Sequence, residues 1–305
     1  MASGNMKIIK RRIKSVGSTM QITKAMELVA SSKLRRAKKK AIDARPYFKE
    51  QVRMLSQIAE SSNIETKFTK KPRLANPENK RSLYIVVAGD RGLAGGYNSG
   101  IFKLAAADYG DSRPKMITIG KKAVEYYEKR GYEIASKHIG LAENVKSGHC
   151  ADIANVAMKL FLDGEVDEVK LFYTRFVSSM TQTPAVMTLL PLPTDSEQIG
   201  TPMAEVGTEQ TQGEEIKAKL RTEVAYDPSP EAVFNRIVPC FLLSILQCAI
   251  TESYASEQCA RRIAMESASD NAEEMIENLS LLYNRARQEK ITNEINEIVG
   301  GANAL

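Results

Sequence analysis

The stretch SLYIVVAGDRGLAGGYN, residues 82–98, joins an apolar run to a glycine-rich loop. The run 82–88 predicts a buried strand, and the segment after the loop predicts a helix. A strand, a glycine loop and a helix in this order often hold a nucleotide phosphate. The loop GDRGLAGGYN, however, lacks the GK[ST] ending of a P-loop and does not match G-x-G-x-x-G. We therefore interpret it as a tight turn between strand and helix rather than as a nucleotide site.

Further strands and helices alternate after this loop. Such alternation predicts βαβ units and a mainly parallel sheet with flanking helices, so the fold class of the centre of the chain is α/β. The expected strands cover residues 115–119, 132–136, 169–175 and 185–190, and the expected helices cover residues 99–109, 121–129 and 151–162.

The N-terminal segment, residues 7–61, has the pattern of one long helix. Apolar or small residues recur at intervals of three and four from Ile9 to Phe48, which predicts a coiled coil. The helix would be roughly 80 Å long, and Pro46 predicts a kink in it. The leading residues 1–5, MASGN, carry no structural signal.

A second long helix is predicted at the C-terminal end. Ser229 and Pro230 suit the cap and first turn of a helix, and only Pro239 interrupts the pattern before Gly300. About 70 residues would extend roughly 105 Å. Because the central domain returns the chain to its starting point, we expect a long antiparallel two-helix coiled coil whose paired residue numbers add to about 290.

The charges of the two predicted helices are opposite in sign. Residues 7–49 hold 14 Lys and Arg against two acidic residues, whereas residues 252–297 hold ten carboxylates against five basic residues. We therefore expect residues 10–14 to face residues 273–277, and residues 33–40 to face Glu252 and Glu257. A nucleic-acid site on the basic stretch 33–40 is the alternative, which the lack of interleaved aromatic residues disfavours.

Residues for catalysis or metal binding are scarce. None of the four cysteines forms a C-x-x-C pair, and there are two histidines, so we expect no catalytic site, cofactor or metal. The adjacent His149 and Cys150 leave a reactive pair as an alternative to buried free thiols. The apolar run 237–250 is too short to cross a bilayer, and no signal peptide is visible, so we expect a cytoplasmic chain.

Both ends of the chain resemble the gamma subunit of F-type ATP synthases. The resemblance lies in RRIKSVGSTMQITKAMELVASSKLRRA, residues 11–37, and in the run from YASEQCARRIAM to the C-terminus, residues 254–305. GDRGLAGGYN resembles the family's own glycine motif, and residues 169–192 resemble its later strand pair. The resemblance implies a rotor shaft without catalysis of its own, which couples ion-driven rotation to ATP synthesis or hydrolysis.

The resemblance also implies partners and a division of the chain. The partners are the alpha and beta subunits of the catalytic ring, the epsilon subunit and the membrane c-ring, with no nucleic acid and no small-molecule substrate. The location is the cytoplasmic face of the bacterial plasma membrane. The expected parts are an N-terminal helix (1–62), a linker (63–81), a central Rossmann-like domain (82–215) and a C-terminal helix (216–305).

The resemblance further implies contacts with the beta subunit, at the residues of this chain that match the family's motifs. Met26 and Arg261 correspond to the place where the shaft meets the beta-subunit lever, and Arg287, Gln288 and Thr292 correspond to a catch by beta-subunit loops. Alternatively, Met26 is plain core and the three polar residues form a solvated face. The end of the last helix carries an apolar stripe that we expect to act as a bearing: Ile291, Ile295, Ile298 and Val299.

Thiol regulation of the chloroplast kind is not expected, because residues 193–215 contain no cysteine. Cys240, Cys248 and Cys259 are spaced to fall near one face of the last helix, which indicates packing.

Overall fold

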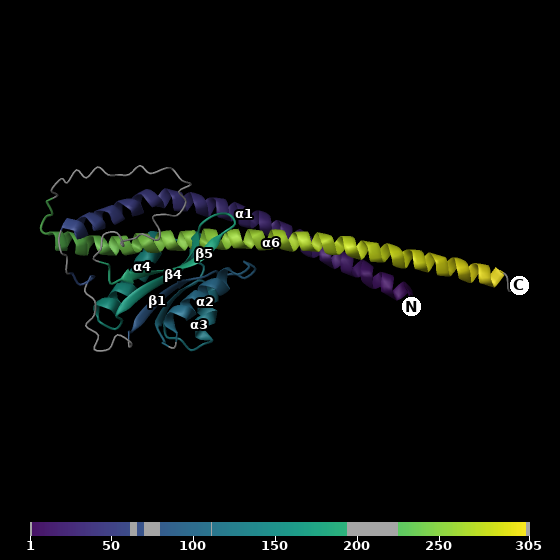
Figure 1. The fold of residues 1–305 in the computed structure, drawn as a ribbon, viewed down its shortest axis with the longest axis horizontal. Coiled ribbons are helices and arrows are strands. Elements are labelled where there is room, and N and C mark those ends of the chain that lie inside the picture. The colour runs from purple at the N-terminus through teal and green to yellow at the C-terminus, as the bar shows by residue number, and fades with distance from the viewer. Residues whose placement is uncertain (1, 62–65, 70–79, 111, 194–224, 303–305) are drawn as a thin grey trace. The chain divides into compact units, whose positions relative to one another are not determined.

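The computed structural model describes residues 2–61, 66–69, 80–110, 112–193 and 225–302. The chain forms two compact units. We call Met1–Ser32 with Arg261–Leu305 the helix-pair unit, and Lys33–Ala260 the central unit. The helices α1 (Ala2–Ser61) and α6 (Pro230–Ala302) contribute to both units (Figure 1). The domain boundaries drawn from the sequence follow chain order and stay a prediction. Most of the expected linker, residues 63–81, lies outside the described residues.

The central unit contains a five-stranded sheet with the order β3-β2-β1-β4-β5. β1, β2, β3 and β4 are parallel, and β5 pairs antiparallel with β4. The predicted α/β fold with a mainly parallel sheet is therefore confirmed; the strand predicted at 115–119 has the expected ends, and the other predicted strands are present with shifted ends. The strands are β1 (Ser82–Val87), β2 (Lys115–Ile119), β3 (Ile134–His138), β4 (Glu168–Phe176) and β5 (Gln182–Leu190).

Both faces of this sheet are covered, since all six residues of β1 are buried. Right-handed crossovers place α2 (Tyr97–Tyr109) and α3 (Lys121–Glu128) on one face and α4 (Ser147–Leu162) on the opposite face. Figure 1 shows α2 and α3 together on one side of the sheet. The short 3₁₀ helix η2 (Ala142–Asn144) was not predicted. The core between the sheet, α2 and α3 is aromatic and includes Tyr84, Phe102, Tyr127 and Phe172.

The helices α1 and α6 run antiparallel. In the helix-pair unit, Thr23 Oγ1 lies 2.7 Å from Ser269 Oγ, and a Cβ on Gly17 would lie 3.9 Å from Ile276 Cδ1. These pairs of residue numbers add to 292 and 293. In the central unit the rings of Phe48 and Phe241 stack with centroids 6.1 Å apart, and their numbers add to 289. The predicted antiparallel pairing with a sum near 290 is confirmed.

Two expectations about the helices are corrected. The helix α1 begins at Ala2, so the leader MASGN is not without structure, since a helix can continue backward through any sequence free of proline. In addition, α6 contains an 18-residue window of mean hydropathy 1.8, which is long and apolar enough to cross a membrane by length and composition. Half of that window is buried inside the protein, as in the core helix of a folded domain. Both helices continue through their internal prolines, Pro46 and Pro239.

Candidate partner-binding surfaces

The glycine loop uses its own polar groups to join three parts of the central unit. The backbone N–H of Gly89 donates to Asn98 Oδ1 at 2.9 Å, and the Gly89 carbonyl accepts from the N–H of Lys122 at 3.0 Å. Asp90 Oδ1 accepts from the N–H groups of Lys121 and Gly140, each at 3.0 Å. The Asp90 carboxylate thus caps the N-terminus of α3, so the loop provides an acceptor for the backbone N–H groups of its neighbours. This arrangement supports the interpretation of the loop as a turn.

Close packing surrounds two of the glycines. A Cβ on Gly120 would lie 2.1 Å from the carbonyl oxygen of Ala88, and Gly120 has a φ of +94°. A Cβ on Gly89 would lie 3.0 Å from Glu257 Cδ of α6. Gly120 therefore has no room for a Cβ beside Ala88, whereas a Cβ at Gly89 would require the Glu257 side chain to shift slightly.

Side chains of α6 complete the free edge of β4. β4 pairs with β1 only as far as Phe172, so the backbone groups beyond it lack a strand on that side. Ser253 Oγ accepts from the N–H of Thr174 at 3.0 Å, and Glu252 Oε1 accepts from the N–H of Phe176 at 2.9 Å. Ser256 Oγ donates to the Thr174 carbonyl at 3.1 Å. The helix therefore substitutes for a neighbouring strand, and buried backbone groups gain partners.

The same face of α6 holds the turn between β4 and β5. The Cys259 thiol donates to the carbonyl of Ser179 at 3.1 Å, and Gln182 Nε2 donates to the Cys259 sulfur at 3.4 Å. Cys259 is buried, whereas Cys240 is exposed and Cys248 is intermediate, so the three cysteines do not share one environment. Sequence reasoning missed these anchors. The signal was the pair of small polar residues, Ser253 and Ser256, about one turn apart just after the apolar run 237–250.

The basic stretch of α1 contacts the central unit differently from the expectation. Lys33 forms an ion pair with Glu143 at 2.8 Å, and Lys40 Nζ lies 3.3 Å from Asn144 Oδ1. Lys38 Nζ lies 4.5 Å from the centroid of the Phe176 ring.

The confirmed register does place residues 33–40 opposite the stretch of α6 that contains Glu252 and Glu257. The ion pair described for this basic stretch, however, joins Lys33 to Glu143 rather than to either of these carboxylates. Glu252 accepts a hydrogen bond from β4, and the Glu257 carboxyl lies against Gly89. A buried backbone donor left without an acceptor costs more than an exposed ion pair contributes, so the sheet edge determines where Glu252 points. In the helix-pair unit, Lys10, Lys14, Glu273 and Glu277 are exposed, and no ion pair among the described residues joins them.

Met26 and Arg261 both belong to the helix-pair unit. Arg261 is only 7% exposed, and Met26 is half-buried. The register of Thr23 and Ser269 places Met26 opposite residue 266, about one turn from Arg261. Five residues of helix span roughly 7.5 Å, so the two residues lie near each other along the helix pair without being opposite one another. Sequence reasoning missed the exposed apolar residues around Met26 on α1: Ile22, Leu28 and Val29.

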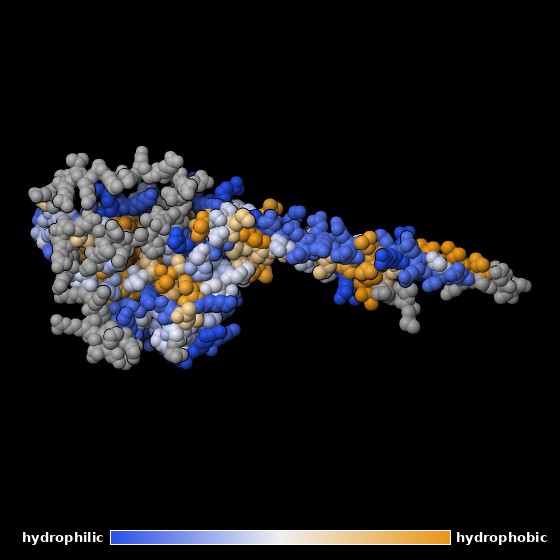
Figure 2. All heavy atoms as spheres, viewed as in Figure 1, coloured by the Kyte–Doolittle hydropathy of each residue, from blue (hydrophilic) through white to orange (hydrophobic). Residues whose placement is uncertain are grey.

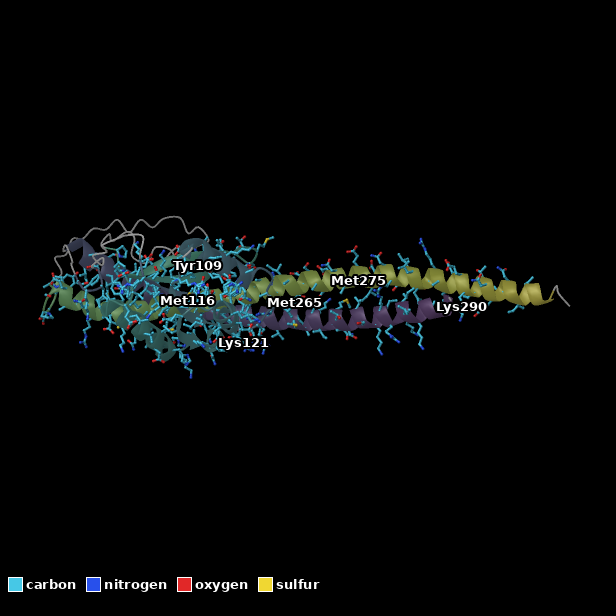
Figure 3. The ribbon with its side chains drawn as sticks, turned by 90° about the horizontal axis from the view of Figure 1, so that it is seen from below. Tyr109, Met116, Lys121, Met265, Met275 and Lys290 are labelled. Carbon is cyan, nitrogen blue, oxygen red and sulfur yellow. The ribbon has the colours of Figure 1, made fainter. Side chains whose placement is uncertain are left out.

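The predicted catch and bearing residues lie on the outer surface of the last part of α6. Arg287, Gln288 and Thr292 are all exposed. The same register pairs Ala2, the first residue of α1, with Lys290, and Figure 3 shows Lys290 near that end of α1. Residues beyond Lys290 therefore extend past α1 and lack its cover. The apolar side chains there are exposed, at 43% for Ile291, 54% for Ile295, 72% for Ile298 and 52% for Val299, and Figure 2 shows hydrophobic residues gathered near this end.

The remaining candidates for chemistry differ in exposure: Cys150 is buried, His138 is half-buried and His149 is exposed. Burial raises the pKa of the Cys150 thiol to about 12, so the thiol stays protonated at neutral pH and is a weak nucleophile. This disfavours the alternative of a reactive pair with His149. Burial also lowers the pKa of His138. Within the residues that the structure describes, no group of three His, Cys, Asp or Glu side chains is placed to hold a metal ion.

Comparison with known proteins assigns this arrangement to a family. The family model described as ATP synthase matches residues 5–305. The chain is 46% identical over 300 residues to the ATP synthase gamma chain of Ruminococcus albus, which covers 96% of both chains. It is 43% identical to the sodium ion specific ATP synthase gamma chain of Acetobacterium woodii, which covers 99% of both. This chain belongs to the ATP synthase gamma chain family.

Solved structures share the fold. A chain of the mitochondrial ATP synthase of Euglena gracilis matches with a TM-score of 0.65 and 17% identity, over 99% of this chain and 95% of that chain. A chain from the central stalk and c-ring of the Tetrahymena thermophila mitochondrial ATP synthase matches with a TM-score of 0.57 and 23% identity, over 81% and 99%. At such identities the likeness concerns the fold.

As a member of the gamma chain family, the chain is a non-catalytic subunit and forms the central stalk of an F-type ATP synthase. The stalk couples ion-driven rotation to ATP synthesis or hydrolysis, and the complex is associated with a membrane. The lack of a P-loop and the carboxylate at the start of α3 accord with a subunit that leaves catalysis to others.

Proposed function

We propose that the helix-pair unit turns inside a ring of alpha and beta subunits while the central unit engages the epsilon subunit and the membrane c-ring. The complex would stand on the cytoplasmic face of the bacterial plasma membrane. The observation that carries this proposal is the uncovered apolar end of α6, where four large aliphatic side chains stay exposed beyond the first residue of α1.

An exposed apolar stripe of this kind marks an interaction surface. Ile291, Ile295 and Ile298 lie three or four residues apart, so they share one side of the helix. Apolar contacts are non-directional, so a smooth sleeve formed by alpha and beta subunits can enclose this end without fixing its rotational position. The end of α6 therefore suits a bearing.

Polar contacts just before this end have the opposite property, because hydrogen bonds are directional. Arg287 and Gln288 are exposed on α6 and offer several N–H donors to acceptors on beta-subunit loops. Thr292 follows Arg287 by five residues and Gln288 by four, so it lies on the next turn of the helix. Such contacts differ among three neighbours that are otherwise equivalent, so they link the rotational position to the nucleotide state of each beta subunit.

Met26 and Arg261 lie nearer to the central unit along the helices, and near each other along the pair. The exposed apolar residues Ile22, Leu28 and Val29 surround Met26 on α1. This surface suits the beta-subunit lever, with Met26 contributing apolar contact. Arg261, which is almost fully buried, would hold the shape of the pair at that level rather than reach a partner freely.

The catch is tested by the double variant Arg287→Ala with Gln288→Ala. We expect an unchanged circular dichroism spectrum and at least about a fivefold loss of steady-state ATPase turnover in the assembled complex, since hydrogen bonds to charged groups are lost. The matched control is Glu273→Ala with Glu274→Ala, two exposed residues on the same helix, and it should keep full turnover. Full turnover in the arginine and glutamine variant would show that these residues are only a solvated face.

A further inference from the structure

A cavity of about 240 Å³ lies within the central unit, and nothing in the rotor function uses it. Its walls come from α1, from the segment around η2 and from α6. α1 contributes three basic side chains, Lys33, Arg36 and Lys40, whereas the acidic side chain among the lining residues is Glu143. The cavity is therefore lined by more positive than negative charge.

The pairing of these side chains leaves two cations uncompensated. Lys33 is held by Glu143, with its Nζ 2.8 Å from Oε1 and 2.9 Å from Oε2. Lys40 Nζ contacts two neutral acceptors, Asn144 Oδ1 at 3.3 Å and the Glu143 carbonyl at 3.5 Å. No hydrogen bond or ion pair joins the Arg36 guanidinium to any residue within the described ranges.

The spacing of the basic residues along α1 places two like charges side by side at the cavity. Arg36 and Lys40 are four residues apart, so they are neighbours on one helix face, and like charges at this spacing destabilise a helix. An anion between them would relieve this repulsion. It would receive charge-assisted hydrogen bonds from a planar guanidinium and an ammonium group, the two donors that proteins use most for phosphate.

The volume limits the size of the ligand. Pockets for drug-sized ligands have volumes of about 300–1,000 Å³, so this cavity is too small for a whole nucleotide. We propose that the cavity between Lys33, Arg36, Lys40 and η2 binds a small doubly charged oxyanion of the phosphate class. Bound there, the anion bridges α1 and the segment after β3, and it strengthens the attachment of this part of α1 to the rest of the central unit.

Calorimetric titration of the full chain with inorganic phosphate, at ionic strength held constant with sodium chloride, tests this site. We expect saturable binding that Arg36→Ala weakens about tenfold, the loss expected for a hydrogen bond to a charged group. Arg35→Ala is the matched control, because Arg35 is exposed on the same helix and does not line the cavity. It should change the affinity less than about twofold.

Equal weakening by Arg35→Ala and Arg36→Ala would overturn the proposal, since it would indicate diffuse attraction to the basic helix. Absence of saturable phosphate binding at matched ionic strength would overturn it as well, and would leave an acidic side chain of a partner subunit as the occupant. Circular dichroism checks that each variant is folded. If Arg36→Ala unfolds, Lys40→Gln provides the same comparison, because it removes the second uncompensated charge.

Discussion

Replacing Ser253 by alanine should weaken the attachment of α6 to the sheet, because this hydroxyl serves two buried partners. Ser253 has no exposed surface. Its Oγ accepts from the N–H of Thr174 at 3.0 Å and lies 3.0 Å from the hydroxyl of Tyr97. Alanine would remove the acceptor of the Thr174 N–H and one contact of the Tyr97 hydroxyl, both at a buried site.

The expected loss follows from these two contacts. A buried polar group left without its partner costs about 1–3 kcal/mol, and the better helix propensity of alanine offsets about 0.5 kcal/mol. We expect a net destabilisation of about 2–4 kcal/mol. For a unit of this size the midpoint of thermal unfolding should then fall by roughly 5–15 °C.

Thermal and urea unfolding of the full chain, followed by circular dichroism, measure this loss. Ser280→Ala is the matched control, since Ser280 lies on the same helix and its hydroxyl donates only to the carbonyl of Ile276 within that helix. The control should change the stability by less than about 0.5 kcal/mol. If Ser253→Ala were no more destabilising than Ser280→Ala, the hydroxyl would not anchor the sheet edge and the reasoning would be refuted.

Gly120→Ala should cost more than about 2 kcal/mol, because its φ of +94° and a Cβ 2.1 Å from the Ala88 carbonyl oxygen require the backbone to move; a loss below about 0.5 kcal/mol in urea unfolding would contradict this geometry. Burial raises the pKa of the Cys150 thiol to about 12 in the folded state, whereas the pKa of a thiol in the unfolded chain is about 8.5. The folded state therefore loses stability as pH rises above about 8.5, up to about tenfold in the folding constant per pH unit, and Cys150→Ala should flatten this part of the pH profile. Cysteines introduced at Thr23 and Ser269, whose hydroxyl oxygens lie 2.7 Å apart, should form a disulfide under mild oxidation, whereas a pair at positions 23 and 280 should stay reduced.

Local patterns in the sequence predicted much of the architecture. The run SLYIVVA is apolar on both sides, and its buried position in the middle of a parallel sheet follows from that composition. The long seams of α1 and α6 predicted two helices that bury each other, since an amphipathic helix needs a partner for its apolar face. The end of α6 was predicted to be exposed on the same ground, because the apolar pattern continues after its partner helix has ended.

The sequence did not predict the polar contacts between distant segments, because one side chain can have several possible partners and the sequence does not show which of them it meets. On the basis of charge alone, we expected Glu252 and Glu257 to lie opposite the basic residues 33–40 of α1. In the folded chain Glu252 accepts from the N–H of Phe176. The free edge of β4 arises only when β1 ends short of it, and no local pattern reveals that difference in length.

The sequence by itself therefore determined the secondary structure, the antiparallel helices and the absence of a P-loop, since each depends on residues close together in the chain or on simple periodicity. The tertiary structure alone decided which side chains of α6 complete the sheet, why Gly120 has no room for a side chain beside Ala88, and where Arg36 and Lys40 line a cavity. These features depend on the register at which separate elements pack. That register follows from the burial of polar backbone groups and of side-chain volume over the whole unit.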